Sequence, residues 1–138
     1  MLLTTYYILL SLFIQSPSFE GQWVSIDDET GLEKSIITLY LENDKLYGRI
    51  EKLLLPEDQG KLCVNCEGKE KNQPIEGLVI LKGLTQDGDD WSGGTILDPA
   101  NGKTYDCTLS LESPNELNVR GFIGFSFLGR TQQWKRSN

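Results

Sequence analysis

The sequence predicts an all-β protein built as a single up-and-down antiparallel β-barrel of about eight strands. From Gly21 to the C-terminus, short segments alternate apolar and polar side chains with the period of two that is typical of half-buried strands. Turns rich in Gly, Asn, Asp and Pro separate these segments, and none has the apolar period of a helix. The connections are local, whereas the alternative, a β-sandwich, usually needs Greek-key crossovers.

The first part of the barrel is predicted to hold three strands. We expect them at Gln22–Ile26, Lys34–Leu41 and Lys45–Leu54, separated by turns at Asp27–Gly31 and Glu42–Lys45. In the third strand, Leu46, Gly48 and Ile50 share one face, and Tyr47 and Arg49 share the other. The segment Leu55–Pro74 then interrupts the pattern. Because it is longer than most connections in a compact domain, it indicates either a functional loop or one held by a covalent link.

The second part is predicted to hold five strands. We expect them at Leu78–Leu84, Trp91–Leu97, Lys103–Glu112, Glu116–Ile123 and Phe125–Lys135. Asp98–Gly102 is a strong hairpin signal, and the strand after it has the cleanest alternation, with Tyr105, Cys107, Leu109 and Leu111 on one face. A barrel of eight strands has room inside for side chains and at most one small ligand.

The N-terminus predicts export. Leu2–Ile14 is largely apolar, and Ser16 and Ser18 lie three and one positions before a cut after Ser18. The apolar run is shorter than the ~20 residues that span a bilayer. We therefore expect a signal peptide at 1–18, a barrel domain at 19–138, and no membrane span after cleavage. No Lys or Arg precedes the run, so the signal is atypical or the true start lies upstream; the alternative is a buried N-terminal strand.

The absence of Cys at the end of the leader argues against a lipid anchor, so we expect the periplasm or the medium. The net charge of −7 and the pI near 4.6 argue against binding to nucleic acid or to anionic lipid. The chain has no His, which removes the commonest general base and the commonest metal ligand. The acidic turns lack the ligand spacing of an EF-hand loop. We therefore predict no enzyme activity, no metal and no cofactor.

Cys63-x-x-Cys66 lies in the long connection, and Cys107 is the third cysteine. A structural disulfide suits an exported protein; a redox centre or a metal site shared with Cys107 are the alternatives. A link to Cys107 would close a longer loop and stabilise more in the chain-entropy model. Because Cys107 shares a face with Leu109, however, we expect it to be a buried thiol, and we predict a Cys63–Cys66 disulfide.

Trp23 begins the first strand in a Gly21-x-Trp23 motif, and Arg130 and Arg136 flank Trp134 in the last strand. In lipocalin-type barrels the indole of such a motif closes one end under an arginine of the final strand, through a cation–π contact. We therefore predict structural closure of the barrel by these four residues. The alternative is that Trp23 lines a ligand pocket.

The segment Val119–Arg130 alternates glycines with large apolar residues between two arginines. Its glycines would relieve crowding where the barrel bends. Its phenylalanines and arginines would also suit an amphipathic ligand with an anionic head. The candidate ligand-binding side chains are Tyr47, Tyr105, Arg120, Phe122, Phe125 and Phe127.

In its order of motifs the chain resembles the secreted bacterial family called domain of unknown function 2147. The matching motifs are Gly21-x-Trp23; Thr30-Gly31 with Lys34-Ser35; Leu46-Tyr47-Gly48; Cys63-x-x-Cys66 with Gly68; Pro74-Ile75-x-Gly77; Gly83-Leu84; Trp91 with Gly94; Asp98-Pro99-x-Asn101-Gly102-Lys103-x-Tyr105; Val119-Arg120-Gly121; and Gly129-Arg130-Thr131-Gln132-x-Trp134-x-Arg136. The resemblance implies a lipocalin-like, calycin-type barrel exported to the bacterial envelope, and it implies no activity.

Two functions fit these features best, and an enzyme fits less well because no spacing singles out catalytic residues. The first is an extracytoplasmic protein that binds a small apolar or amphipathic ligand. The second is a ligand-free module that docks a protein partner through its loops. An apolar cavity inside the barrel would favour the first function, and an interior filled by side chains would favour the second.

Overall fold

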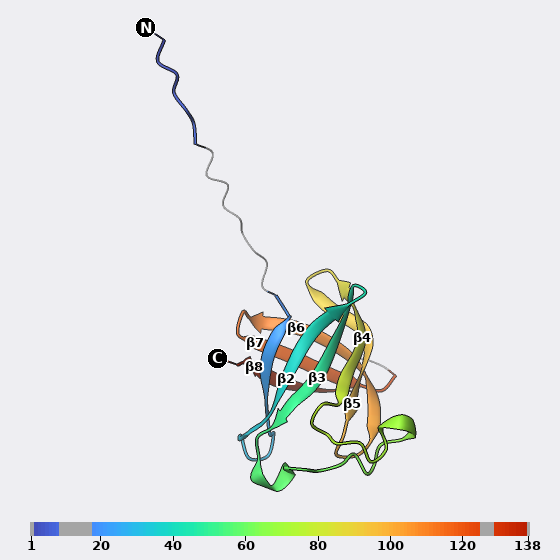
Figure 1. Ribbon diagram of the computed structural model, residues 1–138. Helices are drawn as coiled ribbons and strands as arrows, with labels where there is room; N and C mark the ends of the chain where they lie inside the picture. Colours follow the sequence, from blue (N-terminus) through green and yellow to red (C-terminus); the bar gives the residue numbers. More distant parts are fainter. Residues whose placement is uncertain (1, 9–17, 125–128, 138) are drawn as a thin grey trace.

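The computed structural model describes residues 2–8, 18–124 and 129–137 and shows a closed eight-stranded antiparallel barrel (Figure 1). Each strand pairs with the next, and β1 pairs with β8 to close the barrel. The strands are β1 Gly21–Ile26, β2 Glu33–Glu42, β3 Lys45–Leu53, β4 Val79–Asp87, β5 Asp90–Asp98, β6 Lys103–Ser113, β7 Glu116–Phe122 and β8 Arg130–Arg136. The predicted fold class is confirmed, because the local connections allow every strand to pair with its chain neighbour.

The last strand is shorter than predicted. β8 begins at Arg130, because the ladder with β7 starts at the pair Gly121–Arg130 and β7 ends at Phe122. The predicted strand residues 125–128 lie outside the described part of the chain. At the N-terminus, residues 2–8 are exposed and belong to no strand, unlike the buried strand considered as an alternative to a signal peptide. No helix among the described residues is long and apolar enough to cross a membrane.

The two ends of the barrel are built differently. At one end, uppermost in Figure 1, the hairpins β2–β3, β4–β5 and β6–β7 turn tightly. The opposite end carries the β1–β2 and β5–β6 turns and the long connection from β3 to β4, drawn in green. This connection contains two short 3₁₀ helices, η1 Pro56–Asp58 and η2 Gly68–Glu70. We call these the closed end and the open end.

Trp23 and Arg136 seal the closed end. The indole of Trp23 is fully buried, and the guanidinium carbon of Arg136 lies 4.2 Å from its ring centre. Trp23 Nε1 donates to the backbone carbonyl of Phe19 at 2.9 Å. Of the two arginines considered for this contact, Arg130 lies instead at the open end, where it pairs with Asp28 at 3.0 Å.

The long connection is held close to the β5–β6 hairpin. A disulfide links Cys63 to Cys66, as the spacing predicted, and both residues are buried. Asn65 Nδ2 donates to the carbonyl of Ala100 at 2.8 Å. A Cβ at Gly102 would lie 1.8 Å from the Asn65 carbonyl oxygen, so the two backbones approach too closely for any side chain. The connection is thereby fixed beside the open end.

Candidate ligand cavity

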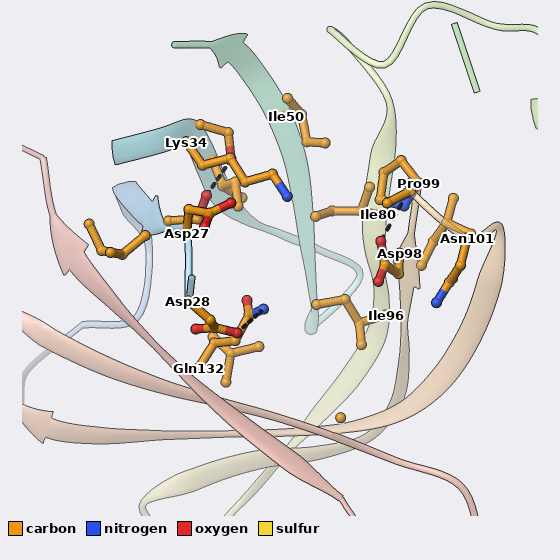
Figure 2. A pocket seen from close by; sticks show the side chains of 18 of the residues that line it. Asp27, Asp28, Lys34, Ile50, Ile80, Ile96, Asp98, Pro99, Asn101 and Gln132 are labelled. Atoms are coloured by element: carbon orange, nitrogen blue, oxygen red, sulfur yellow. Dashed lines mark hydrogen bonds between the residues drawn. The ribbon is translucent and has the colours of Figure 1, made fainter. Parts of the chain in front are cut away.

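A cavity of about 900 Å³ occupies the half of the barrel next to the open end. We call this the open half, and the half next to the closed end the closed half. Its walls are largely apolar and come from several strands: Ile37 of β2, Ile50 of β3, Ile80 of β4, Ile96 of β5 and Val119 of β7. These positions point inward because each strand alternates its side chains between the two faces of the sheet. Figure 2 shows Ile50, Ile80 and Ile96 facing the cavity between two groups of polar side chains.

The rim of the cavity is polar and carries more acids than bases. Among the described residues that line it, the acids are Asp27, Asp28, Glu29, Glu57, Asp58 and Asp98, and the bases are Lys34, Lys61 and Arg130. Some of these charges are paired at the surface: Lys61 contacts Asp58 at 2.8 Å, and Arg130 contacts Asp28. The excess of acids gives the entrance a negative potential that repels anions.

Asp27 is an ordered part of this rim (Figure 2). Its Oδ1 accepts backbone N–H bonds from Glu29 and Thr30, each at 2.9 Å. These bonds, that from Thr30 first, lower the pKa of the Asp27 carboxyl, because they stabilise its charged form. The carboxylate therefore acts as a fixed support for the β1–β2 turn and stays ionised at neutral pH.

A short polar row interrupts the apolar wall. Ser25 and Ser35 are both buried, and their Oγ atoms lie 2.5 Å apart in a hydrogen bond. Ser25 of β1 is paired in register with Ser35 of β2 on one side and with Trp134 of β8 on the other. All three line the cavity. Trp134 is only 2% exposed, and its Nε1 has no hydrogen-bond partner among the described residues.

The predicted ligand-binding residues separate into three groups. Tyr105 and Phe122 line the cavity. Tyr47 lies on the outer face, where its ring stacks on that of Tyr40 at 5.9 Å between centres. Arg120 is absent from the cavity lining, and its Nη1 donates to Thr131 Oγ1 at 3.0 Å across the β7–β8 ladder. Phe125 and Phe127 lie outside the described residues.

Two predicted closure residues also line the cavity. Trp134 forms part of its wall and Arg130 part of its rim, so these residues belong to the open half. Ser25, Ser35 and the four isoleucines of the wall were not among the predicted site residues. A signal for the serines was present, because Ser25 shares its face with Trp23, and Ser35 shares its face with Ile37. Within the described ranges, no group of three or more Cys, Asp or Glu side chains could hold a metal ion.

The comparisons with known proteins agree with this architecture. Residues 21–136 match the family model described as "Uncharacterized protein conserved in bacteria (DUF2147)", and the chain belongs to this family. A solved structure with a similar fold is described as "Protein HP1028 from the human pathogen Helicobacter pylori belongs to the lipocalin family". It superposes with a TM-score of 0.77 at 19% identity, over 89% of this chain and 85% of that one. No curated protein matches the chain.

Proposed function

We propose that this member of the DUF2147 family is an exported binding protein that holds one small apolar or amphipathic molecule in the open half of its barrel. The observation that carries the proposal is the cavity of about 900 Å³ with isoleucine walls and a polar rim. Small-molecule sites are concave, mostly apolar and roughly 300–1,000 Å³ in volume. Eight-stranded barrels of the lipocalin type hold one small ligand in this way, which supports the proposal by analogy of fold.

The cavity also weighs against the alternative function. A ligand-free module that docks a partner through its loops has no need of space inside its barrel, and its stability would gain from filling that space. The lining of this cavity instead comes from β2, β3, β4, β5 and β7, and from β6 through Tyr105. An internal binding site accounts for this arrangement more directly than docking through the loops.

Export is supported by the leader and by the Cys63–Cys66 disulfide, since disulfides persist mainly outside the cytoplasm. We expect the mature protein to begin at Phe19 and to be recovered from the periplasm or the medium. N-terminal sequencing of protein from a fractionated native host measures this. Protein that begins at Met1 and is found in the cytoplasm would contradict export without bearing on ligand binding.

Binding can be tested with N-phenyl-1-naphthylamine, an uncharged probe that fluoresces in apolar surroundings. Gly121 lines the cavity, and a Cβ built on it lies 3.6 Å from Ile96 and from Tyr105, an ordinary contact distance. Gly121→Leu should therefore place bulk in the cavity and weaken probe binding at least about tenfold. Asn118→Leu places the same side chain on the outer face of the same strand and should leave binding unchanged.

Two results would count against an internal site. One is an absence of saturable probe fluorescence with the wild-type protein. The other is equal weakening by Gly121→Leu and Asn118→Leu, with both variants folded by circular dichroism. Native mass spectrometry of protein taken from its own envelope provides an independent measurement, because a natural ligand should appear as a mass that Gly121→Leu fails to retain.

A further inference from the structure

We infer, on the basis of the proposed function, that the molecule held in the cavity is an amphipathic cation, and that Asp98 at the mouth binds its positively charged group. The class comprises ammonium and guanidinium compounds with an apolar chain or ring. The apolar part contacts the isoleucine walls, and the cationic group stays at the polar rim. This charge is opposite to that of the anionic head that the phenylalanines and arginines of residues 119–130 suggested.

Asp98 occupies an inward-facing position at the mouth of the cavity. It is the last residue of β5 and lies two positions after Ile96, so the pleat of the strand places both side chains on the same face. Both line the cavity, and Figure 2 shows them on the same side of it as Ile80. The Asp98 carboxylate is therefore placed to meet the polar end of a molecule whose apolar part lies between the isoleucines.

The Asp98 carboxylate is held in place but has no cation of its own. Its Oδ1 accepts the backbone N–H of Ala100 at 2.9 Å, and its Oδ2 accepts no hydrogen bond from the described residues. No Lys or Arg of the described chain lies within ion-pair distance of it. Lys103, its register partner, is exposed and lies outside the cavity lining. Oδ2 is therefore left to accept a charge-assisted hydrogen bond from an ammonium or guanidinium group.

Two of the three bases that line the cavity are already paired with acids of the rim. Lys61 contacts Asp58 at 2.8 Å, and Arg130 contacts Asp28 at 3.0 Å. These pairs offset each other's charge and leave more acids than bases at the entrance. The remaining field attracts cations and repels anions.

Lys34, the third base of the lining, makes no ion pair within the described chain, but it lies near Asp27. The N–H bond from Thr30 contributes most to the lowered pKa of the Asp27 carboxyl, and the charge of Lys34 lowers this pKa further. Figure 2 shows Lys34 and Asp27 across the cavity from Asp98. An anionic group at Lys34 would be repelled by Asp27, whereas a cationic group at Asp98 lies on the side of the cavity away from Lys34.

The test is displacement of N-phenyl-1-naphthylamine from the purified protein by three ten-carbon molecules: decylammonium, 1-decanol and decanoate. At an ionic strength of about 0.01 M, we expect decylammonium to bind roughly tenfold more tightly than decanoate, with 1-decanol between them. The difference should fall to about threefold or less at roughly 0.5 M salt, because salt screens partly exposed charges. Equal or tighter binding of decanoate would overturn the inference. A preference that salt leaves unchanged would also overturn it, because its origin would not be electrostatic.

Variants locate the preference. Asp98→Asn keeps an oxygen for the Ala100 N–H and removes the charge, so we expect it to reduce the preference for decylammonium over decanoate to about twofold or less. Binding of the uncharged probe should not change. Asp106→Asn is the matched control: it removes the same charge at an exposed position on the outer face of β6, outside the cavity lining, and should retain most of the preference. Equal losses in the two variants would trace the preference to net charge and overturn the assignment to Asp98.

If Asp98→Asn fails to fold, Asp98→Ser decides the question, because a serine hydroxyl can also accept the turn N–H. We expect the same loss of preference, and an unchanged preference in this folded variant would refute Asp98 as the cation site. Failure of this inference is separable from failure of the proposed function. Saturable probe binding that Gly121→Leu weakens would still support an internal site, even if decanoate bound as tightly as decylammonium.

Discussion

The closed and open halves of this barrel use the same eight strands for different purposes. The closed half is filled by large, fully buried side chains: Trp23, Leu39, Leu46, Leu84, Leu109 and Leu117. The open half is lined by isoleucines around a cavity of about 900 Å³. The difference shows that the two halves are packed differently, and it supports our proposal that the open half binds a ligand. Close packing in one half supplies the free energy of folding, and this allows the other half to keep space for a ligand.

The two tryptophans show the same division. Trp23 lies under Arg136 and has its N–H satisfied by the backbone, so every part of its indole has a protein partner. Trp134 packs into the wall of the cavity, and its buried N–H has no partner within the described part of the chain. One indole therefore closes the barrel, and the other forms part of the cavity wall.

The largest effect is expected from Trp23→Ala. Truncating a buried indole leaves a cavity and typically lowers the free energy of unfolding by ~3–5 kcal/mol, a large part of the ~5–15 kcal/mol available to a domain. Urea unfolding followed by circular dichroism measures the change. If the variant melts within a degree or two of the wild type but loses N-phenyl-1-naphthylamine binding, then Trp23 belongs to a binding site and the division between the halves is wrong.

Two matched truncations compare the packing of the closed half with that of the open half. Leu84→Ala removes a fully buried side chain from the closed half and should lower the free energy of unfolding by ~2–5 kcal/mol. Ile96→Ala removes a partly buried side chain that already faces a cavity, and it should cost only roughly 1 kcal/mol because less apolar contact is lost. Equal losses in parallel urea titrations would show that the open half is packed as tightly as the closed half.

The two arginines of β8 should contribute unequally to stability, and Arg136 at the closed end should contribute more. Arg136→Met removes a cation–π contact and donors to the carbonyls of Ser18, Glu20 and Pro114, which should lower the free energy of unfolding by about 1–3 kcal/mol. Arg130→Met removes an exposed ion pair with Asp28, and the change should stay within about 0.5 kcal/mol. Thermal unfolding at matched salt compares them. A larger loss for Arg130→Met would reverse the assignment of closure to Arg136.

The smallest effect on stability at neutral pH is expected from Cys107, the buried free thiol of β6. Burial raises its pKa from 9.0 to about 12. The folded protein therefore retains the thiol proton to higher pH than the unfolded chain, so stability should be constant below about pH 9 and fall between pH 9 and 12. Cys107→Ala should show a shallower fall over this window in urea titrations at stepped pH. Identical slopes for the two proteins would contradict the shift.

The fold was largely predictable because its signals are local. Alternation with a period of two marked most of the strands, and β6 follows the predicted face from Tyr105 to Leu109. The spacing of Cys63 and Cys66 indicated their disulfide. The same alternation could have excluded Tyr47 from the ligand site, because Tyr47 lies between the inward-facing Leu46 and Gly48.

The site was less predictable because it depends on strands that are distant in sequence. Arg120 was predicted as a ligand-binding residue because of its charge. Its neighbours Val119 and Gly121 line the cavity, so the alternation of the strand places Arg120 on the outer face, where it donates to Thr131. Ser25 and Trp134 are separated by most of the chain and become neighbours only when β1 pairs with β8. No local sequence pattern predicts the pairing of β1 with β8.

By itself, then, the sequence determined the all-β class, the approximate strands, the disulfide and a tryptophan–arginine contact between the first and last strands. Tertiary structure decided that Arg136 makes this contact, that the isoleucines surround a cavity, and that Trp134 lies beside Ser25. The physical reason is closure. The alternation of side chains and the spacing of cysteines are properties of short segments of sequence. The register of the β1–β8 ladder, in contrast, determines which side chains lie at the same level inside the barrel. In this ladder Trp134 is paired with Ser25, and Arg136 with Trp23.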